Sequence, residues 1–298
     1  MDLVGLHQPG CEAASMNIGK LGVFHFLDAL SAAEMVALAR LSEQLGYGAL
    51  WYPEALGRES MACAAWLLAH TDRLVVASGI ANIYARDAQA TAAAHLALNE
   101  MSNGRFLLGL GVSHAPLVEG LRGHDASRPL QTMRSYLQKI QQATYRAPQP
   151  ARVGELILAA LGPKMLELAA SQSDGAHPYN VTPEHTRRAR QILGPDKKLY
   201  VEQKVALVTD PQQARDLARQ AMDFYMGLPN YRNNWLSLGF HEDDLAGPSD
   251  RFLDAMVAWG EPGQVRSRLD EHYQAGADHV CIQVLGDLEA GLKALAPS

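Results

Sequence analysis

The sequence contains little cysteine, and its cysteines are not arranged for cross-linking. Its 298 residues include three, Cys11, Cys63 and Cys281, which are odd in number, widely spaced and outside any C-x-x-C motif. This pattern favours neither a disulfide framework nor a structural zinc site. We therefore expect reduced, packed cysteines and no bound metal.

Positive charge and long apolar runs are scarce as well. Lys and Arg number 26 against 32 Asp and Glu, and no four basic residues are consecutive, which argues against binding of nucleic acid. The longest apolar run, residues 61–69, is far shorter than the roughly 20 residues that cross a bilayer. The first ten residues, MDLVGLHQPG, have no signal-peptide pattern. We expect a cytoplasmic protein with no membrane or nucleic-acid partner.

Hydrophobic periodicity predicts one unit repeated along the chain: a short apolar run, a turn and an amphipathic helix. Several runs, such as LVVASGI, are apolar on both faces, which is typical of parallel strands covered by helices. The eight predicted strands are Leu21–Phe26, Ala49–Pro53, Leu74–Ile83, Phe106–Leu110, Leu156–Ala160, Asp174–His177, Leu199–Val208 and His279–Leu285.

Three helix starts have clear capping residues. Ser31 is followed three positions later by Glu34, which makes a capping box, and Thr182 and Asp210 each precede a proline. A cap followed by proline at the first helical position is typical of a helix N-terminus. These starts place helices directly after predicted strands.

Eight strand–helix units without a GxGxxG after the first strand predict a closed (β/α)8 TIM barrel rather than a doubly wound sheet. Residues 1–298 are expected to form a single barrel domain. Two connections, about 111–154 and 226–260, are too long for turns and are predicted inserts after strands four and seven. Active sites of such barrels lie at the C-terminal ends of the strands, so these inserts are expected to wall the site.

The most informative strand end is GLGVSHAP at 109–116. Gly109 and Gly111 allow a ligand to approach the backbone, and Ser113 adds a hydroxyl group. The alternative is a glycine-rich strand end inside a packed barrel. His114 follows at once, and its imidazole can exchange a proton near neutral pH. The alternative for His114 is a histidine that only hydrogen-bonds the loop.

Two further strand ends carry candidate ligand groups. Gly79 interrupts an apolar strand, which indicates a bulge or a place where a ligand lies against the backbone, and Asn82 brings an amide. Gly162, Pro163 and Lys164 begin a helix, so free backbone NH groups and an ammonium could hold an anion. The alternatives are a satisfied core amide for Asn82 and a surface lysine for Lys164.

Lys204 lies inside a predicted strand, close to Glu202. A lysine inside a barrel can form a Schiff base with a carbonyl substrate, as in a class I aldolase. The simpler interpretation, which we prefer, is an ion pair with Glu202.

Several of these segments together resemble one family. They are GYGALWYPEALGRE, VVASGIANIYARDA, GRFLLGLGVSHAPLVEG, AALGPKMLELAA, DGAHPYNVTPEH, LPNYRNNW and GADHVCIQVL. In this order they resemble the bacterial luciferase-like superfamily, and within it the luciferase-like-monooxygenase class of deazaflavin (F420)-dependent oxidoreductases. The resemblance extends from about Leu21 to Leu285.

The resemblance implies an F420 or FMN ring at the strand C-terminal mouth. A bulge with a non-prolyl cis peptide, typical of the superfamily, falls on Gly79 and Ile80, and a contact to the ring edge falls on Asn82. The strand-four loop falls on Gly111, Val112, Ser113 and His114, and the phosphate loop falls on Gly162, Pro163 and Lys164.

The same resemblance gives the candidate catalytic residues. Glu54 is similar to an acid near the cofactor in the family's sugar-phosphate dehydrogenases. Those enzymes have a histidine after this acid and a second acid in the strand-four loop, whereas this chain has Ala55 and His114. Oxidation of sugar phosphates is therefore not indicated, and His114 and His25 are the candidate acid/base groups.

The leading hypothesis is an oxidoreductase that moves a hydride between F420 and a small organic substrate, without a metal. The closest alternative is an FMN-dependent monooxygenase of the same fold. An aldolase acting through Lys204 or Lys164, and a flavin-binding protein without turnover, are less favoured. Residues Tyr225, Asn230, Tyr231, Asn234 and Trp235 in the second insert offer aromatic and amide groups to a substrate, or they pack the loop. The resemblance also implies a homodimer, because luciferase-like barrels usually associate through helices of their first units, and MACAAWLLAH is such an apolar helix here; the alternative is a helix that faces the core.

Overall fold

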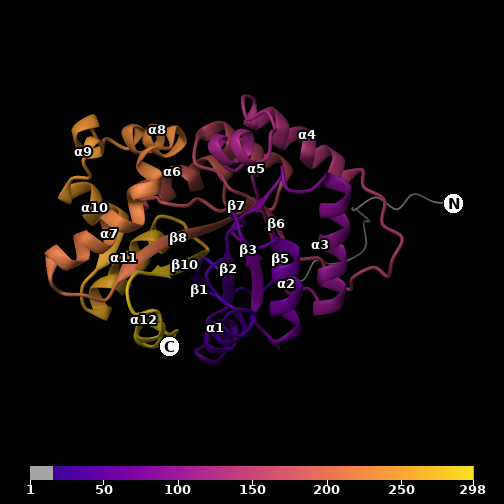
Figure 1. Ribbon diagram of the computed structural model, residues 1–298, viewed down its shortest axis with the longest axis horizontal. Helices are drawn as coiled ribbons and strands as arrows, with labels where there is room; N and C mark the ends of the chain where they lie inside the picture. The colour runs from indigo at the N-terminus through magenta and orange to yellow at the C-terminus, as the bar shows by residue number, and fades with distance from the viewer. Residues whose placement is uncertain (1–15, 298) are drawn as a thin grey trace.

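The computed structural model describes residues 16–297, and its centre is a closed barrel of eight parallel strands surrounded by helices (Figure 1). The barrel closes because β10 pairs with both β1 and β8. The strands are β1 (Leu21–Phe24), β2 (Ala49–Tyr52), β3 (Val75–Ser78) continued by β4 (Ala81–Asn82), β5 (Phe106–Gly111), β6 (Leu156–Leu158), β7 (Gly175–Ala176), β8 (Lys198–Ala206) and β10 (His279–Val284). The predicted TIM barrel is confirmed.

Helices follow the strands and cover the outside of the barrel (Figure 1). They are α1 (Ala32–Gln44), α2 (Ser60–Ala69), α3 (Ala88–Ser102), α4 (Pro129–Gln141), α5 (Pro163–Gln172), α6 (Pro183–Leu193), α7 (Pro211–Met226), α11 (Pro262–Gln274) and α12 (Leu288–Leu295). The three predicted caps are confirmed. Ser31 and Glu34 form the reciprocal capping box of α1, and Thr182 and Asp210 accept hydrogen bonds from the first turns of α6 and α7.

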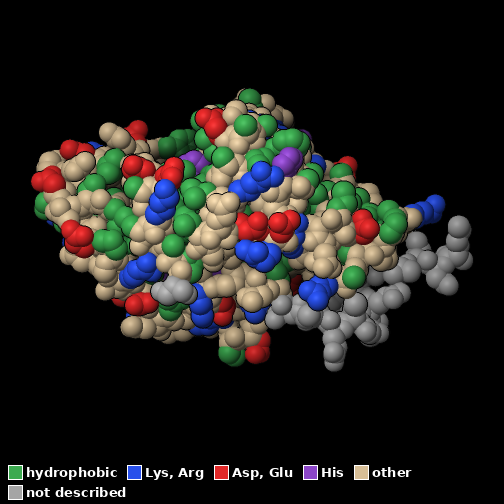
Figure 2. All heavy atoms as spheres, turned by 90° about the horizontal axis from the view of Figure 1, so that it is seen from below, with side chains coloured by type: hydrophobic (Ala, Val, Ile, Leu, Met, Phe, Trp, Pro, Cys, Tyr) green, Lys and Arg blue, Asp and Glu red, His purple; other side chains and the backbone are tan. Residues whose placement is uncertain are grey.

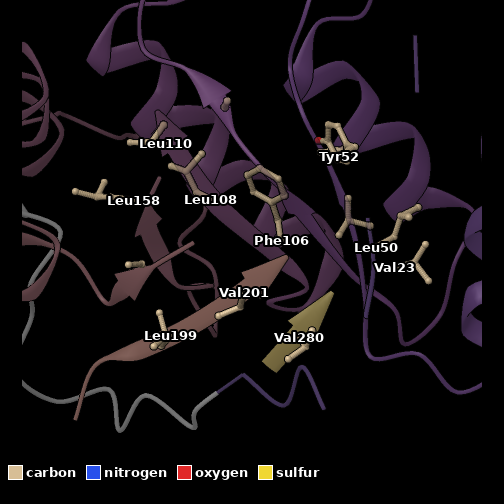
Figure 3. Close-up of a cluster of buried hydrophobic side chains, with 14 of the residues drawn as sticks. Val23, Leu50, Tyr52, Phe106, Leu108, Leu110, Leu158, Leu199, Val201 and Val280 are labelled. Atoms are coloured by element: carbon tan, nitrogen blue, oxygen red, sulfur yellow. The ribbon is translucent and has the colours of Figure 1, made fainter. Parts of the chain in front are cut away.

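Each strand buries both of its faces, as the apolar runs predicted. Side chains at alternate positions point outward to the helices, among them the residues that Figure 3 labels from Val23 to Val280. The other positions point into the barrel, where Phe24, Trp51, Leu107 and Tyr200 pack together. This alternation places Glu202 and Lys204 inside the barrel, because they share the parity of Tyr200 on β8.

Both predicted inserts are present. The first carries a π-helix, η1 (Pro116–Leu121), before α4. The second follows α7 and contains α8 (Pro229–Ser237), α9 (Glu242–Ala246), α10 (Asp250–Met256) and a short strand, β9 (Val257–Trp259), which pairs with the end of β8. Its helices lie on one side of the barrel (Figure 1) and have an apolar cluster of their own around Trp235 and Phe252. The sequence did not predict β9, because three residues are too few to show a period.

The remaining composition-based expectations concern the surface and the cysteines. Cys63 and Cys281 are free and buried, whereas Cys11 and the N-terminal decapeptide lie outside the described residues. Acidic and basic side chains are interspersed on the face that Figure 2 shows. Within residues 16–297, no helix is both long and apolar enough to cross a bilayer, and no cluster of metal-ligating side chains occurs.

Candidate active site

At the C-terminal end of the barrel, the third strand is interrupted by a backbone bulge. The peptide bond between Gly79 and Ile80 is cis, at the position that the family resemblance implied. The end of β2 holds this bulge: Gly79 N donates to Tyr52 O (2.7 Å), and Glu54 N donates to Ile80 O (3.0 Å). Glu54 also accepts a bond from Asn82 N through its carboxylate (2.7 Å). The bulge is therefore fixed on both sides.

The carboxylate of Glu54 forms a buried ion pair with Arg86. Its side chain is 3% exposed and accepts two hydrogen bonds from the guanidinium of Arg86 and one from Ser60 N. Arg86 also pairs with the more exposed Glu59. Through these contacts Glu54 holds the backbone of the bulge in place. Arg86 was not a candidate from the sequence, since nothing in its neighbourhood shows that it folds back on a strand end.

The glycines of the bulge region differ in what a side chain would meet. A Cβ at Gly111 would lie 2.4 Å from Ile80 Cδ1, so glycine is required beside the bulge. A Cβ at Gly79 would lie 3.1 Å from both His177 Nε2 and Phe24 Cε2. A side chain at Gly79 would therefore point at the rings of His177 and Phe24.

His114 stands in the loop after β5, where the sequence placed it. Ser113 has a left-handed backbone (φ 55°), and with half-buried Val112 it turns the chain out of the strand. The His114 ring lies 5.7 Å from the Tyr231 ring and 6.2 Å from the Phe224 ring. It has no hydrogen-bond partner among residues 16–297. Burial lowers its pKa below 6.5, so the neutral imidazole predominates at pH 7.

The other sequence candidates lie at the same end of the barrel but apart from His114. Gly162 caps α5 and has open space around it, Pro163 is the first helical residue, and Lys164 is exposed. His25 follows β1, and its backbone NH donates to Trp51 O (2.9 Å). Its half-buried ring has a pKa lowered by burial. None of the contacts within residues 16–297 joins His25 to His114.

Lys204 forms the ion pair with Glu202 that the sequence favoured. Both side chains are 1% exposed, and Nζ lies 3.2 Å from Glu202 Oε1. The ammonium also donates to Asn180 Oδ1 and lies 3.9 Å from the centre of the Tyr179 ring. Burial lowers the pKa of Lys204 and raises that of Glu202, while each partner's charge opposes the shift. The ammonium thus has two hydrogen-bond partners and an aromatic ring against it, which disfavours a Schiff-base lysine.

Aromatic rings from distant segments meet above this pair. Tyr179 follows β7, and its ring lies 5.1 Å from Phe24 of β1 and 5.5 Å from Tyr225 of α7. Tyr231 of α8 lies 5.2 Å from Tyr225. Of the insert residues named from the sequence, Tyr225, Tyr231, Asn234 and Trp235 are buried, and Asn230 is exposed.

Sequence reasoning missed His177, which lies at the floor of the mouth. Its ring is 1% exposed and stacks on Trp51 at 4.5 Å. Nδ1 donates to Tyr200 O (2.9 Å), and Nε2 has no partner among the described residues. Burial lowers its pKa to about 4, so Nε2 is a bare acceptor beneath Gly79. The available signal was a histidine at the C-terminal end of the predicted strand Asp174–His177.

Three known proteins show what this chain is similar to. It is 30% identical over 201 residues to a Mycobacterium tuberculosis protein named as a coenzyme F420-dependent oxidoreductase, spanning 57% of each chain. It is 25% identical over 307 residues to the 5,10-methylenetetrahydromethanopterin reductase of Archaeoglobus fulgidus, spanning 88% of this chain and 92% of the relative.

The third is a solved structure, the oxygenating constituent of 3,6-diketocamphane monooxygenase from Pseudomonas putida in complex with FMN. It superimposes with a TM-score of 0.71 over 93% of this chain and 96% of that one, at 12% identity. This likeness concerns the fold alone. The luciferase-like monooxygenase family, however, has a sequence model that matches residues 16–279. The chain therefore belongs to the luciferase-like monooxygenase family.

Proposed function

We propose that the protein is an F420-dependent oxidoreductase that transfers a hydride between the deazaflavin and a small organic substrate. The observation that carries the proposal is the braced bulge at Gly79 and Ile80, which offers a rigid main-chain surface at the mouth of the barrel. A planar ring needs such a surface, because hydride transfer requires the two carbons to be held about 3–3.5 Å apart. A relative named as an F420-dependent oxidoreductase favours the deazaflavin.

The residues present fit such a group. Gly111 leaves room beside the bulge, since a Cβ there would collide with Ile80. The Asn82 amide oxygen accepts from Tyr84 N (2.9 Å), which leaves its NH2 group to donate to a ring carbonyl. The open N-terminus of α5 at Gly162, with Lys164, suits a phosphate group. Val112 and Ser113 would line the adjoining edge.

Each protein group then has a separate task. The bound deazaflavin would supply the carbon that accepts or gives the hydride. Glu54 would hold the bulge through Asn82 N and Arg86, and so act as a positioning residue. His114 would take or return the substrate proton, since its ring is neutral and unpaired. His25 is the second candidate for that proton.

A second candidate is an FMN-dependent monooxygenase. The observation that favours it is the likeness of the fold to an FMN complex of a monooxygenase. The same bulge and the same helix N-terminus would serve FMN, because both ligands combine a tricyclic ring with a phosphate.

Absorbance titration of the purified protein with F420 and, separately, with FMN tests the proposal. We expect micromolar binding of F420, seen as a shift of its visible band, and weaker binding of FMN. Tighter binding of FMN would favour the monooxygenase, and binding of neither would contradict both candidates. A Lys164→Gln variant should weaken either cofactor several-fold, because it removes the ammonium at the α5 N-terminus.

We also propose that the protein is a cytoplasmic homodimer that associates through α2. On this helix Trp66 is 43% exposed, and Leu56 just before the helix is 67% exposed. Large exposed apolar side chains such as these are enriched in interfaces between protein chains. Sedimentation should give twice the 32.4 kDa chain mass, and a Trp66→Glu variant should sediment as a monomer. A wild-type monomer at micromolar concentration would contradict the dimer.

A further inference from the structure

Trp51 lies against the bulge, inside the barrel. It is completely buried, and its Cε3 atom lies 3.3 Å from the Cβ position of Gly79. The indole therefore contacts the backbone segment that is proposed to hold the cofactor ring. Tryptophan and tyrosine are among the side chains that lose a single electron most easily, so a one-electron oxidant on the bulge would take its electron from Trp51.

The Trp51 indole donates its hydrogen to a histidine that can accept it. Nε1 donates to His279 Nε2 (3.1 Å). The other ring nitrogen of His279 lies 2.9 Å from Gly19 O, and since a carbonyl only accepts, Nδ1 carries the hydrogen and Nε2 carries none. Burial lowers the pKa of His279 to about 4, so the ring is neutral at pH 7. The acceptor on the NH group stabilises the positive charge of an oxidised indole.

Tyr200 is the next oxidisable ring, and its hydroxyl is bonded to a carboxylate. Its ring lies 5.8 Å from that of Trp51, edge to face. The hydroxyl donates to Glu155 Oε2 (2.5 Å). A buried tyrosine loses an electron readily only when its hydroxyl proton leaves as well, because the cation is costly to bury. Burial raises the pKa of Glu155, which makes its carboxylate a better proton acceptor than an exposed one.

This pairing of a tyrosine with a carboxylate occurs once within residues 16–297. The other hydrogen-bonded tyrosine hydroxyls contact backbone carbonyls or uncharged side chains. Glu155 directly precedes β6 and is half-buried, so it lies at the N-terminal end of the barrel, opposite the mouth. The series Gly79, Trp51, Tyr200 and Glu155 therefore crosses the barrel from the mouth to the opposite end.

We propose that Trp51 and Tyr200 form a one-electron relay that carries an oxidising equivalent from the cofactor site at the mouth to Glu155 at the opposite end of the barrel. The oxidant is a light-excited flavin or deazaflavin ring. The relay is an activity separate from hydride transfer, and it removes oxidising equivalents from the mouth. Its starting point rests on the proposed function, because Trp51 lies against the surface assigned to the cofactor.

The step balances in electrons and protons. Trp51 gives one electron to the oxidant, and Tyr200 then gives one electron to Trp51. As Tyr200 is oxidised, its O–H bond breaks and the proton goes to Glu155 Oε2. At the end the oxidant has gained one electron, Trp51 is restored, Tyr200 is a neutral radical and Glu155 is a neutral acid.

The test illuminates the protein with bound F420 or FMN, freezes it and records its electron paramagnetic resonance spectrum. A cobalt(III) ammine complex in solution accepts the transferred electron, so that it cannot return. We expect a tyrosyl radical, identified by the narrower signal that ring-deuterated tyrosine gives. Tyr200→Phe and Trp51→Phe should each lower its yield by about fivefold or more. The matched control is Tyr47→Phe, which removes a buried hydroxyl bonded to Leu292 O (2.9 Å) and should keep the full yield.

Glu155→Gln separates proton transfer from packing. The amide keeps an oxygen that accepts the Tyr200 hydrogen bond, but this oxygen does not take up a proton at neutral pH. We expect the tyrosyl yield to fall by about fivefold or more and a tryptophan radical to remain in its place. Cofactor affinity should stay unchanged, because Glu155 lies at the far end of the barrel.

A second arm of the test starts the relay without the cofactor. A ruthenium polypyridyl photo-oxidant is attached to Leu56→Cys, at a position just after β2 that is 67% exposed in the wild type. Cys11→Ser is included so that the label has one site, since Cys63 and Cys281 are buried. Illumination should again give the tyrosyl radical, and Tyr200→Phe should remove it.

The two arms separate the inference from the proposed function. If neither F420 nor FMN binds, the proposed function fails, and the labelled protein decides the inference. The inference is overturned if the wild type forms no tyrosyl radical in an arm whose oxidant is in place. It is equally overturned if Tyr200→Phe, Trp51→Phe or Glu155→Gln keeps the full yield.

Discussion

Two buried ion pairs stand on opposite sides of the barrel mouth, and they do different work. On the β2–β3 side, Glu54 pairs with Arg86 and also bonds the backbone NH groups of Ser60 and Asn82. On the β8 side, the Lys204–Glu202 pair turns its ammonium toward side chains, the amide of Asn180 and the ring of Tyr179. The first pair bonds main-chain NH groups on two segments, whereas the second bonds side chains and one backbone NH, that of Asn180.

The difference matches what each side would bind. A cofactor ring is the same in every turnover, so it suits a backbone surface that no side-chain rotamer can alter. A substrate is recognised by its functional group, so it needs a hydroxyl or amide held in one orientation. The pairs also differ in the number of acidic partners that the basic side chain has. Arg86 has Glu59 as a second acidic partner, whereas Lys204 has Glu202 alone among the acids of residues 16–297.

The largest effect is expected from breaking the Lys204–Glu202 pair, in which the lysine has no second acidic partner among residues 16–297. Lys204→Met leaves Glu202 buried without its counter-charge, which should lower the free energy of unfolding by about 3–5 kcal/mol. Restoring neutrality with Glu202→Gln should recover most of that loss. Urea unfolding monitored by circular dichroism measures both. A single variant as stable as the wild type would show that water reaches the pair and that it is not the closed unit described here.

His114 belongs to neither ion pair, so its replacement is expected to change turnover rather than stability. Because the ring has no hydrogen-bond partner among the described residues, His114→Ala should change stability by less than about 1 kcal/mol. It should lower turnover by roughly 10²–10⁴, the range for a lost general acid or base. Single-turnover reduction of bound F420 measures the rate. An unchanged rate in His114→Ala would move the role to His25.

The pH dependence follows from the lowered pKa of His114. Burial disfavours imidazolium, so the folded-state pKa lies below 6.5 and the neutral base is present above it. The rate of substrate oxidation should therefore be level near pH 7 and fall only below pH 6.5. His114→Ala should remove this inflection. An inflection above pH 7 in the wild type would indicate another proton acceptor.

Glu54→Gln should have a smaller effect than Lys204→Met, since Arg86 keeps Glu59 and the amide still reaches the NH of Asn82 or Ser60. We expect a loss of about 1–2 kcal/mol in unfolding free energy and about tenfold weaker cofactor binding, because the bulge loosens. Isothermal titration with F420 measures the affinity. A loss of stability without any change in cofactor affinity would separate Glu54 from the cofactor surface.

The smallest effect is expected at Gly79. A Cβ there meets His177 and Phe24 at 3.1 Å and Trp51 at 3.3 Å, so Gly79→Ala should cost up to about 1 kcal/mol and leave F420 affinity within threefold. Gly109→Ala is the matched control, since its Cβ would lie 2.0 Å from Ser78 O and should destabilise far more. A lost cofactor site in stable Gly79→Ala would mean that the ring reaches deeper than the bulge.

The fold could be predicted because its determinants are local. Apolar runs gave the strands, and Ser31, Thr182 and Asp210 gave three helix starts, because capping depends on neighbours in sequence. The position of the bulge followed from family resemblance together with one glycine. The mouth was harder, because its key contacts join residues far apart in the chain. Arg86 lies 32 residues from Glu54, and no periodicity encodes that contact.

Lys204 and Glu202 were recognised as a pair, yet their attachment to Tyr179 and Tyr225 was not visible in the sequence. Tyr225 was named only as a residue of the second insert, since its helix could have packed anywhere on the barrel. His177 was passed over because a buried histidine differs from an exposed one only through its tertiary surroundings. The barrel was thus readable from the sequence, and the division of its mouth into two sides was not.

The most direct test of that division measures cofactor affinity in two variants. The dissociation constant for F420 is determined in Glu54→Gln and in the Glu202→Gln/Lys204→Met double variant. The account predicts that Glu54→Gln weakens F420 binding about tenfold, while the double variant binds F420 as the wild type does. Equal losses of F420 affinity in both variants would contradict it, because the mouth would then be one cooperative unit rather than two independently braced sides.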